Sequence, residues 1–298
     1  MAILVMLVGV AGSGKSTYAQ KIKNQHENAE IFSSDALRLE LYGDENDQTH
    51  NKEVFEELHK RIHAHLAKDG VAIYDACNLT SKIRTGFLKT LKSSVRKVCH
   101  IIPATYDQAV ARQELRERKV PAEVIHRQFC SFQTPYWHEG WDEIHLHTTA
   151  ESRLNLYDMV EASVKIPHCN PHHKYTIGKH CFKAFQYAHD AGFSELIQDA
   201  ALYHDIGKPF VKSFTNSRGE ATDVAHYYSH QNYGAYLILL GGEDNFEVDI
   251  SPLTLSFLVC YHMEEFIRKD KVDKFYNLVG PAATKQLKQL HECDVNAH

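Results

Sequence analysis

The sequence has little of what a disulfide-bonded or membrane-embedded protein needs. Its seven cysteines are odd in number and include no C-x-x-C pair, which argues against both a disulfide framework and a thiolate zinc site. The apolar run Ile3–Val8 is short, precedes glycines and follows no basic leader, so we expect neither a signal peptide nor a membrane helix there. These absences predict a cytoplasmic protein in a reducing compartment, without a membrane partner.

An excess of basic charge is also missing. The net charge of −5 argues against a broad basic surface that coats nucleic acid, although it allows local arginine and lysine clusters at a polynucleotide end. The sequence contains no internal repeat and no low-complexity tract. What it does contain is 298 residues, 43% of them hydrophobic, which is enough to bury a core in each of two domains.

Residues 1–150 alternate short apolar runs with helical segments, a pattern typical of a parallel sheet with crossover helices. The predicted strands are Ile3–Val8, Ile31–Ser33, Val71–Ala76, Val98–Pro103 and Glu143–His147. The predicted helices follow Lys15, Asp35, Lys52, Ser81 and Asp107, with a further one over Ala122–Gln133. The first half is therefore expected to be an α/β domain.

Residues 151–165 predict a connecting helix, and residues 166–298 predict a second, all-α domain with helical periodicity and almost no strand alternation. The predicted helices of this domain are Ile177–Ala191, Ser194–His204, Ser229–Leu240, Pro252–Glu265, Lys271–Val279 and Ala282–Asp294. Between them, Lys212–Tyr228 is the one predicted loop long enough to form a lid.

A phosphate-binding motif follows the first strand directly. The G-x-x-x-x-G-K-S loop stands between a predicted strand and a predicted helix, as nucleotide binding requires. Backbone N–H groups and the helix N-terminus can hold the phosphates of ATP, while Lys15 contacts the β and γ oxygens and Ser16 ligates Mg²⁺. The residues expected to bind the cofactor are Gly9, Gly12, Ser13, Gly14, Lys15, Ser16 and Thr17.

The loop motif does not identify the molecule that accepts the phosphate. Asp35 and Arg38 stand one helical turn apart at the carboxyl edge of the predicted sheet, where ligands of open α/β folds bind. Asp35 can take the proton of an attacking hydroxyl, or it can simply cap the helix. Arg112 and Arg116 are spaced to share a helix face and clamp the transferring phosphate, or to form a solvated charged face.

With Ser34-Asp35-x-x-Arg38, Asp75-x-x-Asn78 and Arg112-x-x-x-Arg116 before Val120-Pro121, residues 1–150 resemble the phage-type polynucleotide 5′-kinases, within the small P-loop kinases. The resemblance implies that Asp35 is the general base for a 5′-hydroxyl and that Arg38 contacts the phosphate next to the acceptor nucleoside. It also implies that Arg112 and Arg116 bind the donor phosphates and that Val120-Pro121 packs beside the acceptor base. It assigns no role to Asp75.

The second half carries imidazoles and carboxylates. His204-Asp205 is weak evidence for a metal site by itself, but an aspartate can bridge two cations because both its oxygens bind. Mixed imidazole and carboxylate ligation suits Mn²⁺, Co²⁺, Ni²⁺, Fe²⁺ or Zn²⁺ better than Mg²⁺ alone. Two such ions bind phosphate oxygens and lower the pKa of a water molecule.

Histidines and aspartates recur through the second half in a fixed order: His180, His204-Asp205-Ile206-Gly207-Lys208, Ser229-His230, His262 and Asp294. Over about 125 residues this order resembles the HD phosphohydrolase superfamily. The resemblance implies two metal sites that share Asp205, with Lys208 on the substrate phosphate. The implied ligands are His180, His204, Asp205 and Asp294 for one ion, and His230 and His262 for the other. His226 is either a further ligand or a loop residue, and His172 and His173 are expected to support the ligands or the fold.

Together the halves resemble bifunctional enzymes that heal nucleic-acid ends. Such a kinase and phosphatase would act on RNA or DNA ends with a 5′-OH and a 2′,3′-cyclic, 2′- or 3′-phosphate, before an RNA ligase seals them. Two rival classes remain open. A small-molecule or nucleoside kinase fused to an HD nucleotidase needs no polynucleotide groove, and a nucleotide sensor needs no acceptor site. A non-enzymatic scaffold would explain neither motif set.

Overall fold

The computed structural model describes residues 1–116, 119–171, 174–241, 246, 250–267 and 271–297. His172 and His173 lie outside these residues. The chain divides into two compact units, Met1–Gln128 with Pro135–Ser152, and Phe129–Thr134 with Arg153–His298. The predicted domain limits at 150 and 165 remain a prediction, and the second compact unit also includes Phe129–Thr134.

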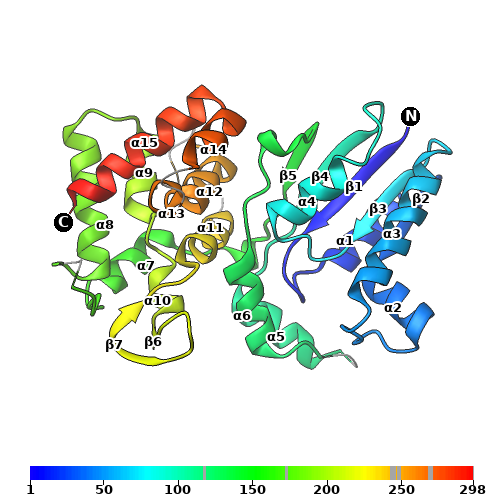
Figure 1. The fold of residues 1–298 in the computed structure, drawn as a ribbon, viewed down its shortest axis with the longest axis horizontal. Coiled ribbons are helices and arrows are strands. Elements are labelled where there is room, and N and C mark those ends of the chain that lie inside the picture. Colours follow the sequence, from blue (N-terminus) through cyan, green and yellow to red (C-terminus); the bar gives the residue numbers. More distant parts are fainter. Residues whose placement is uncertain (117–118, 172–173, 242–245, 247–249, 268–270, 298) are drawn as a thin grey trace. The chain divides into compact units, whose positions relative to one another are not determined.

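The first unit is built on a parallel sheet of five strands in the order β2-β3-β1-β4-β5 (Figure 1). The strands are β1 (Ile3–Val8), β2 (Ala29–Ser33), β3 (Val71–Asp75), β4 (Arg96–Ile101) and β5 (Glu143–Leu146). Each lies within two residues of its predicted bounds at both ends. Since β1 pairs with both β3 and β4, it is central, and the loop that follows it emerges at the middle of the carboxyl edge.

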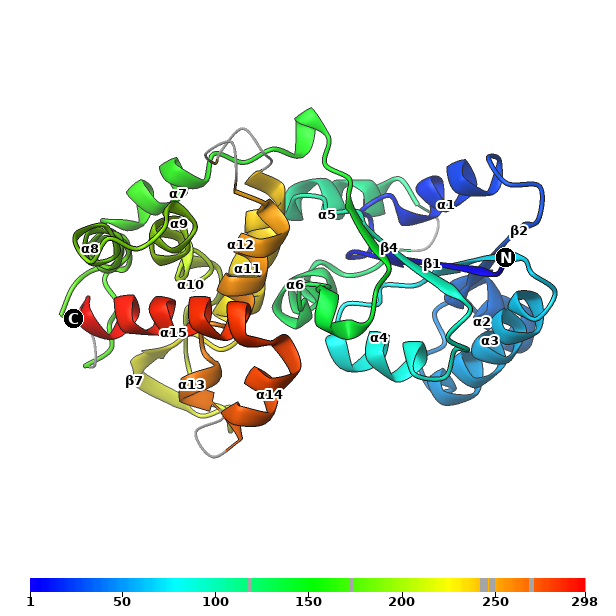
Figure 2. The same ribbon diagram turned by 90° about the horizontal axis from the view of Figure 1, so that it is seen from above.

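Helices cover both faces of this sheet, with α1 and α5 on one face and α2, α3 and α4 on the other (Figure 2). Their bounds are α1 (Lys15–Lys23), α2 (Ser34–Tyr42), α3 (Asn51–Leu66), α4 (Ser81–Leu88), α5 (Tyr106–Glu114) and α6 (Ala122–Ser131). Short 3-10 helices lie at η1 (Trp137–Glu139) and η2 (Ala150–Ser152). Side-chain hydroxyls of Ser33, Thr80 and Thr105 cap α2, α4 and α5, as short polar residues do at helix starts.

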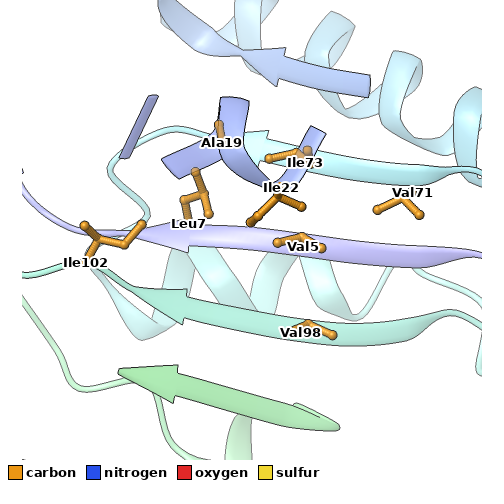
Figure 3. Packing of buried hydrophobic residues seen from close by; sticks show 8 residues of the cluster. All are labelled: Val5, Leu7, Ala19, Ile22, Val71, Ile73, Val98 and Ile102. Carbon is orange, nitrogen blue, oxygen red and sulfur yellow. The ribbon is translucent and has the colours of Figure 1, made fainter. Parts of the chain in front are cut away.

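The core beneath α1 is aliphatic (Figure 3). Alternate residues of the central strands point to the same face of the sheet, and there they meet Ala19 and Ile22 of α1. The other members of this cluster are Val5, Leu7, Val71, Ile73, Val98 and Ile102. Burial of these side chains fixes α1, and with it the loop that precedes α1, against the sheet.

A buried ion pair holds the turn after β3. Arg84 of α4 and Glu139 of η1 are both buried, and their side chains form a bidentate pair of 2.6 and 2.8 Å. The same guanidinium donates to the carbonyls of Asn78 and Leu79, at 3.0 and 2.8 Å. Trp141 donates to Glu139 as well. These partners satisfy the buried charges, and the turn that carries Asn78 is fixed as a result.

The second unit is helical. Its helices are α7 (Leu156–Ser163), α8 (Ile177–Asp190), α9 (Glu195–Tyr203), α10 (Lys208–Val211), α11 (His230–Gly241), α12 (Pro252–Tyr261), α13 (Glu264–Ile267), α14 (Val272–Val279) and α15 (Pro281–Asn296). Helices α8 and α9 pack together, as do α11 and α12, and α15 packs on α8, α9 and α12 (Figure 1). No helix in the described part of the chain has the length and hydropathy to cross a membrane.

Three expectations for this unit were wrong in detail. The loop predicted over Lys212–Tyr228 contains an antiparallel hairpin of β6 (Ser213–Thr215) and β7 (Ala221–His226). Gly219, at φ +82°, lies in the turn of this hairpin, and the short, polar strands carry little alternation. The connecting helix is limited to α7, and the helix predicted over Pro252–Glu265 ends at Tyr261 before α13 begins.

Candidate functional site

The loop between β1 and α1 needs glycine at two positions. Gly12 and Gly14 adopt φ of +79° and +104°, which L-residues with a side chain rarely do. A Cβ on Gly12 would also lie 2.5 Å from the carbonyl oxygen of Ala109 in α5. Gly14 is the N-cap of α1, so the helix starts with its unpaired N–H groups directed at the loop. This is the geometry of an anion site.

Two cations border the loop. The Lys15 Nζ donates to the carbonyl of Val10 at 2.8 Å, which folds its side chain back over the loop. Arg112, in the last turn of α5, donates to the carbonyls of Gly12 and Ser13 at 3.1 and 3.2 Å. Both cations therefore contact the loop that the sequence predicts to bind phosphates. Of the other predicted cofactor residues, Gly9 is buried, whereas Ser16 and Thr17 are exposed.

The arginine pair does not share a helix face, so that expectation was wrong. Helix α5 ends at Glu114, and Arg116 lies two residues beyond, where its backbone N–H donates to the carbonyl of Gln113. The side-chain oxygen of Gln113 also accepts from the backbone N–H of Val120. Arg116 thus lies beyond the end of the helix that carries Arg112.

Asp75 lies close to several of the residues that are predicted to act in the kinase. It ends β3, it is buried, and burial raises its pKa. Lys15, a hydrogen bond from Ser16 and the charge of Arg116 oppose that rise, while Asp35 adds to it. All four lie close enough to act on one carboxylate. The sequence marked Asp75 as part of the Asp75-x-x-Asn78 motif, but assigned no role to it.

Asp35 and Arg38 form an ion pair on α2. The Nη1 atom of Arg38 donates to Asp35 Oδ1 at 2.9 Å, and its Nη2 donates to Asn51 Oδ1 at 2.7 Å. Its guanidinium carbon lies 5.7 Å from the ring centroid of Phe55. Since Ser33 is the N-cap of α2, the carboxylate of Asp35 is not needed as the cap. Its side chain is half-buried in the first turn of α2, directly after the carboxyl end of β2.

In the second unit, five helices bring six side chains together. His180 lies in α8 and Asp294 in α15, while His204 and His262 directly follow α9 and α12. His230 is the first residue of α11. The ligand atoms fall into two groups, each within 4.8 Å, and all are buried. The first group is His180, His204 and Asp294, and the second is Asp205, His230 and His262.

Asp205 faces both groups with different oxygens. Its Oδ2 lies 3.5 and 3.3 Å from the Nε2 atoms of His180 and His204. Its Oδ1 lies 3.2 and 4.0 Å from those of His230 and His262. One carboxylate thus stands between two imidazole pairs, which is the placement that a ligand bridging two cations requires.

The four imidazoles are oriented in the same way. The Nδ1 atoms of His204, His230 and His262 each lie 2.8 Å from a backbone carbonyl three residues earlier. The Nδ1 of His180 faces the carbonyl of Ala297 at 3.4 Å. Donation of Nδ1–H to a carbonyl leaves the Nε2 lone pair free toward the centre of the cluster. The donor set, four such nitrogens and two carboxylates, therefore fits two divalent transition metals.

The electrostatics of the cluster favour a cation. Burial raises the pKa of Asp205, but Lys208 and His204 outweigh it and hold that pKa well below its usual range. The pKa of Asp294 is also well below its usual range, because the effects of His180 and His204 outweigh that of burial. Burial opposes protonation of His204, yet the adjacent Asp205 raises its pKa to about 10. Buried carboxylates with this demand for positive charge match a metal centre.

Lys208 borders the centre, and His168 supports it. The Nζ of Lys208 lies 2.6 Å from Asp205 Oδ2 and 3.4 Å from His168 Nε2, with the ring of Tyr227 at 5.4 Å. His168 faces the carbonyl of Tyr175 with Nδ1 at 2.7 Å, so its Nε2 is the acceptor. No motif in the sequence marks His168 as a residue of this site. His226 belongs to neither metal group and stacks on Tyr228.

Each half of the chain matches a known domain family. Residues 4–135 match the AAA domain family, and residues 178–295 match the HD domain family. The chain thus joins a P-loop domain of the kinase type to an HD domain, which confirms the predicted order and fold class of the two halves. An HD domain implies divalent metal, and a P-loop implies a nucleotide with Mg²⁺.

Solved structures are similar to parts of the chain only. Two structures of a Pnkp1/Rnl/Hen1 complex, one described as an RNA repair complex, share 21% and 20% identity over 40% and 43% of the chain, with TM-scores of 0.36 and 0.39. The chain spans 41% and 42% of those structures. A fungal RNA kinase shares 13% identity over 49% of this chain and 39% of its own, with a TM-score of 0.37. No curated protein matched the chain.

Proposed function

We propose that this protein heals nucleic-acid ends by two opposite phosphate reactions, most fittingly in RNA repair. The P-loop half would transfer the γ-phosphate of ATP to a 5′-OH end. The HD half would remove a 2′,3′-cyclic, 2′- or 3′-phosphate. The observation that carries the proposal is that one chain combines a glycine-rich loop and an Asp35–Arg38 ion pair with a buried cluster of potential metal ligands around Asp205. An RNA ligase would join the healed ends.

In the kinase half, each residue would have a distinct task. Asp35 would accept the proton of the attacking 5′-hydroxyl, whose oxygen forms a bond to the γ-phosphorus as the bond to the β-phosphate oxygen breaks. Arg38 would bind the phosphate that follows the terminal nucleoside. Lys15, Arg112 and Arg116 would hold the donor phosphates. Ser16 would ligate Mg²⁺, and its hydrogen bond to Asp75 would orient it.

The kinase proposal is tested with γ-labelled ATP and three acceptors: a 5′-OH oligonucleotide, a 3′-nucleoside monophosphate and a free nucleoside. We expect phosphate transfer to the first far above the last, because only a chain or a 3′-nucleotide offers Arg38 a phosphate. Equal rates on all three, or transfer to sugars or nucleosides alone, would assign the half to small-molecule kinases instead.

In the HD half, His180, His204 and Asp294 would hold one ion, His230 and His262 the other, and Asp205 both. Mn²⁺, Co²⁺, Ni²⁺, Fe²⁺ or Zn²⁺ suit this set. Two ions would supply Lewis acidity toward phosphate oxygens and a water of lowered pKa. Lys208 would bind the terminal phosphate. Water adds to phosphorus and the bond to the ribose oxygen breaks, first in the cyclic ester and then in the monoester.

The phosphatase proposal is tested with oligonucleotides that end in a 2′,3′-cyclic, a 2′- or a 3′-phosphate, beside free nucleoside monophosphates and deoxynucleoside triphosphates. We expect release of phosphate from the oligonucleotide ends. Hydrolysis of free nucleotides with the ends untouched would make the HD half a nucleotidase and would remove the repair function.

A further inference from the structure

A stacked pair of rings lies beside the acceptor edge of the first unit. The rings of Tyr42 and His50 are parallel, with centroids 4.2 Å apart and planes 9° from one another. Tyr42 ends α2, and His50 is the N-cap of α3. Both residues are exposed, with 37% of Tyr42 accessible and 46% of the His50 side chain. An exposed stack of this kind presents flat apolar faces to solvent.

The stack is on the same side of α2 as the acceptor residues. Asp35, Arg38 and Tyr42 are spaced i, i+3 and i+7, so the three side chains share one helix face. Tyr42 is the fourth residue after Arg38, which corresponds to a rise of about 6 Å along the helix. Asn51, which accepts from Arg38 at 2.7 Å, is the neighbour of His50 in the chain. A ligand phosphate on Arg38 would therefore have the rings within one nucleotide of it.

The pair is held in place before any ligand binds. Asp47 accepts from the Nδ1 of His50 at 2.6 Å and from Thr49, which fixes the imidazole plane. Helices α2 and α3 are joined by Arg61, which pairs with Glu40 at 2.6 Å and with Glu57 at 3.0 Å. A base that stacks on rings already ordered loses less conformational entropy than one that must order them.

We propose that Tyr42 and His50 form a stacking platform for the second nucleobase of the acceptor strand, and so select polynucleotides over mononucleotides. This rests on the kinase function proposed above. Aromatic side chains bind successive bases of single strands in a sequence-tolerant way. The carboxylate of Asp47 contacts His50 at 2.6 Å, so the contribution of the platform comes from base stacking and not from a phosphate contact.

The test is a double-mutant cycle between the protein and its substrate. The full-length protein and Tyr42→Ala are compared on a 5′-OH oligonucleotide and on the same oligonucleotide with an abasic second position. We expect KM for the intact strand to rise about tenfold in Tyr42→Ala, the range that one base–aromatic stack provides. The abasic strand should show a similar rise with the unaltered protein, and no further rise with the variant. Tyr42→Trp should restore the low KM.

Tyr157→Ala is the matched control, because Tyr157 is also an exposed tyrosine, with 49% of it accessible, but belongs to α7 of the second unit. It should leave the KM of both strands unchanged. If Tyr42→Ala raises KM equally for intact and abasic strands, or not at all, the platform is refuted while the kinase function stands. If no 5′-OH oligonucleotide is phosphorylated by the unaltered protein, it is the proposed function that fails.

Discussion

His180 Nε2 lies 3.0 Å from Asp294 Oδ1, although 114 residues separate them in the chain. The contact joins α8 to α15, and His204 completes the group from the end of α9. A metal centre assembled from helices so far apart in sequence depends on the whole helical unit. The nucleotide site depends on a separate sheet. The two activities should therefore be lost independently.

Asp35→Ala should lower phosphorylation of 5′-OH ends about 100- to 10,000-fold, the usual contribution of a general base, and spare phosphate removal. Asp205→Ala should spare the kinase but lower phosphate removal by at least about 100-fold. Loss of a group that merely hydrogen-bonds to a metal ligand lowers activity about 10- to 100-fold, and we expect loss of the bridging ligand itself to lower it further. Both assays are run on each purified variant, with circular dichroism to confirm folding. A folded single variant that loses both activities would contradict two independent centres.

Chelation should silence the HD half, because four of its six proposed ligands are imidazoles. After removal of the chelator, Mn²⁺, Co²⁺ or Ni²⁺ should restore phosphate release more fully than Mg²⁺, and the kinase should respond to Mg²⁺ alone. Metal content measured by mass spectrometry should reach two equivalents in the unaltered protein. Full phosphatase activity in metal-free protein would exclude this centre.

His168→Ala should lower kcat/KM of phosphate release about tenfold, because Lys208 would lose a hydrogen-bond acceptor, and such a bond to a charged group contributes about 1.5–3 kcal/mol. His168→Gln keeps an acceptor and should recover most of the loss. Bound metal should stay at the level of the unaltered protein. The exposed His189 on α8 offers a control substitution. If glutamine and alanine were equally damaging, His168 would not act through Lys208.

His100 should make the protein less stable in acid. Burial lowers its pKa from the ordinary 6.5 to about 3, and the neighbouring His147 adds to the effect. Between these pH values the unfolded chain binds a proton at His100 and the folded chain does not, so stability is full above pH 6.5 and falls as pH drops toward 3. Urea midpoints at pH 7 and pH 5 should differ less in His100→Gln than in the unaltered protein. An unchanged difference would show that His100 does not contribute.

Local patterns account for most of the predicted fold. The strands before β5 follow from short apolar runs, because a buried parallel strand needs apolar residues on both faces. Strand β5 instead alternates polar and apolar residues. The arginine pair shows where such reasoning stops. Its i, i+4 spacing continued the helical pattern, but α5 ends at Glu114, and the Gln113 side chain instead accepts from the backbone of Val120. The sequence did not predict the hairpin β6–β7, because its strands are short and mostly exposed and therefore carry no apolar pattern.

The sequence by itself determined the phosphate-binding loop, because consecutive residues form it and its glycine conformations are set within a few bonds. It also determined the identity and order of the metal-ligand candidates. Only the tertiary structure decided that Asp205 faces two histidine pairs, that Asp75 lies among Lys15, Ser16 and Asp35, and that His168 supports Lys208. Those relationships join residues from separate strands and helices. Their distances are fixed by how the apolar faces of those elements pack, which no local spacing specifies.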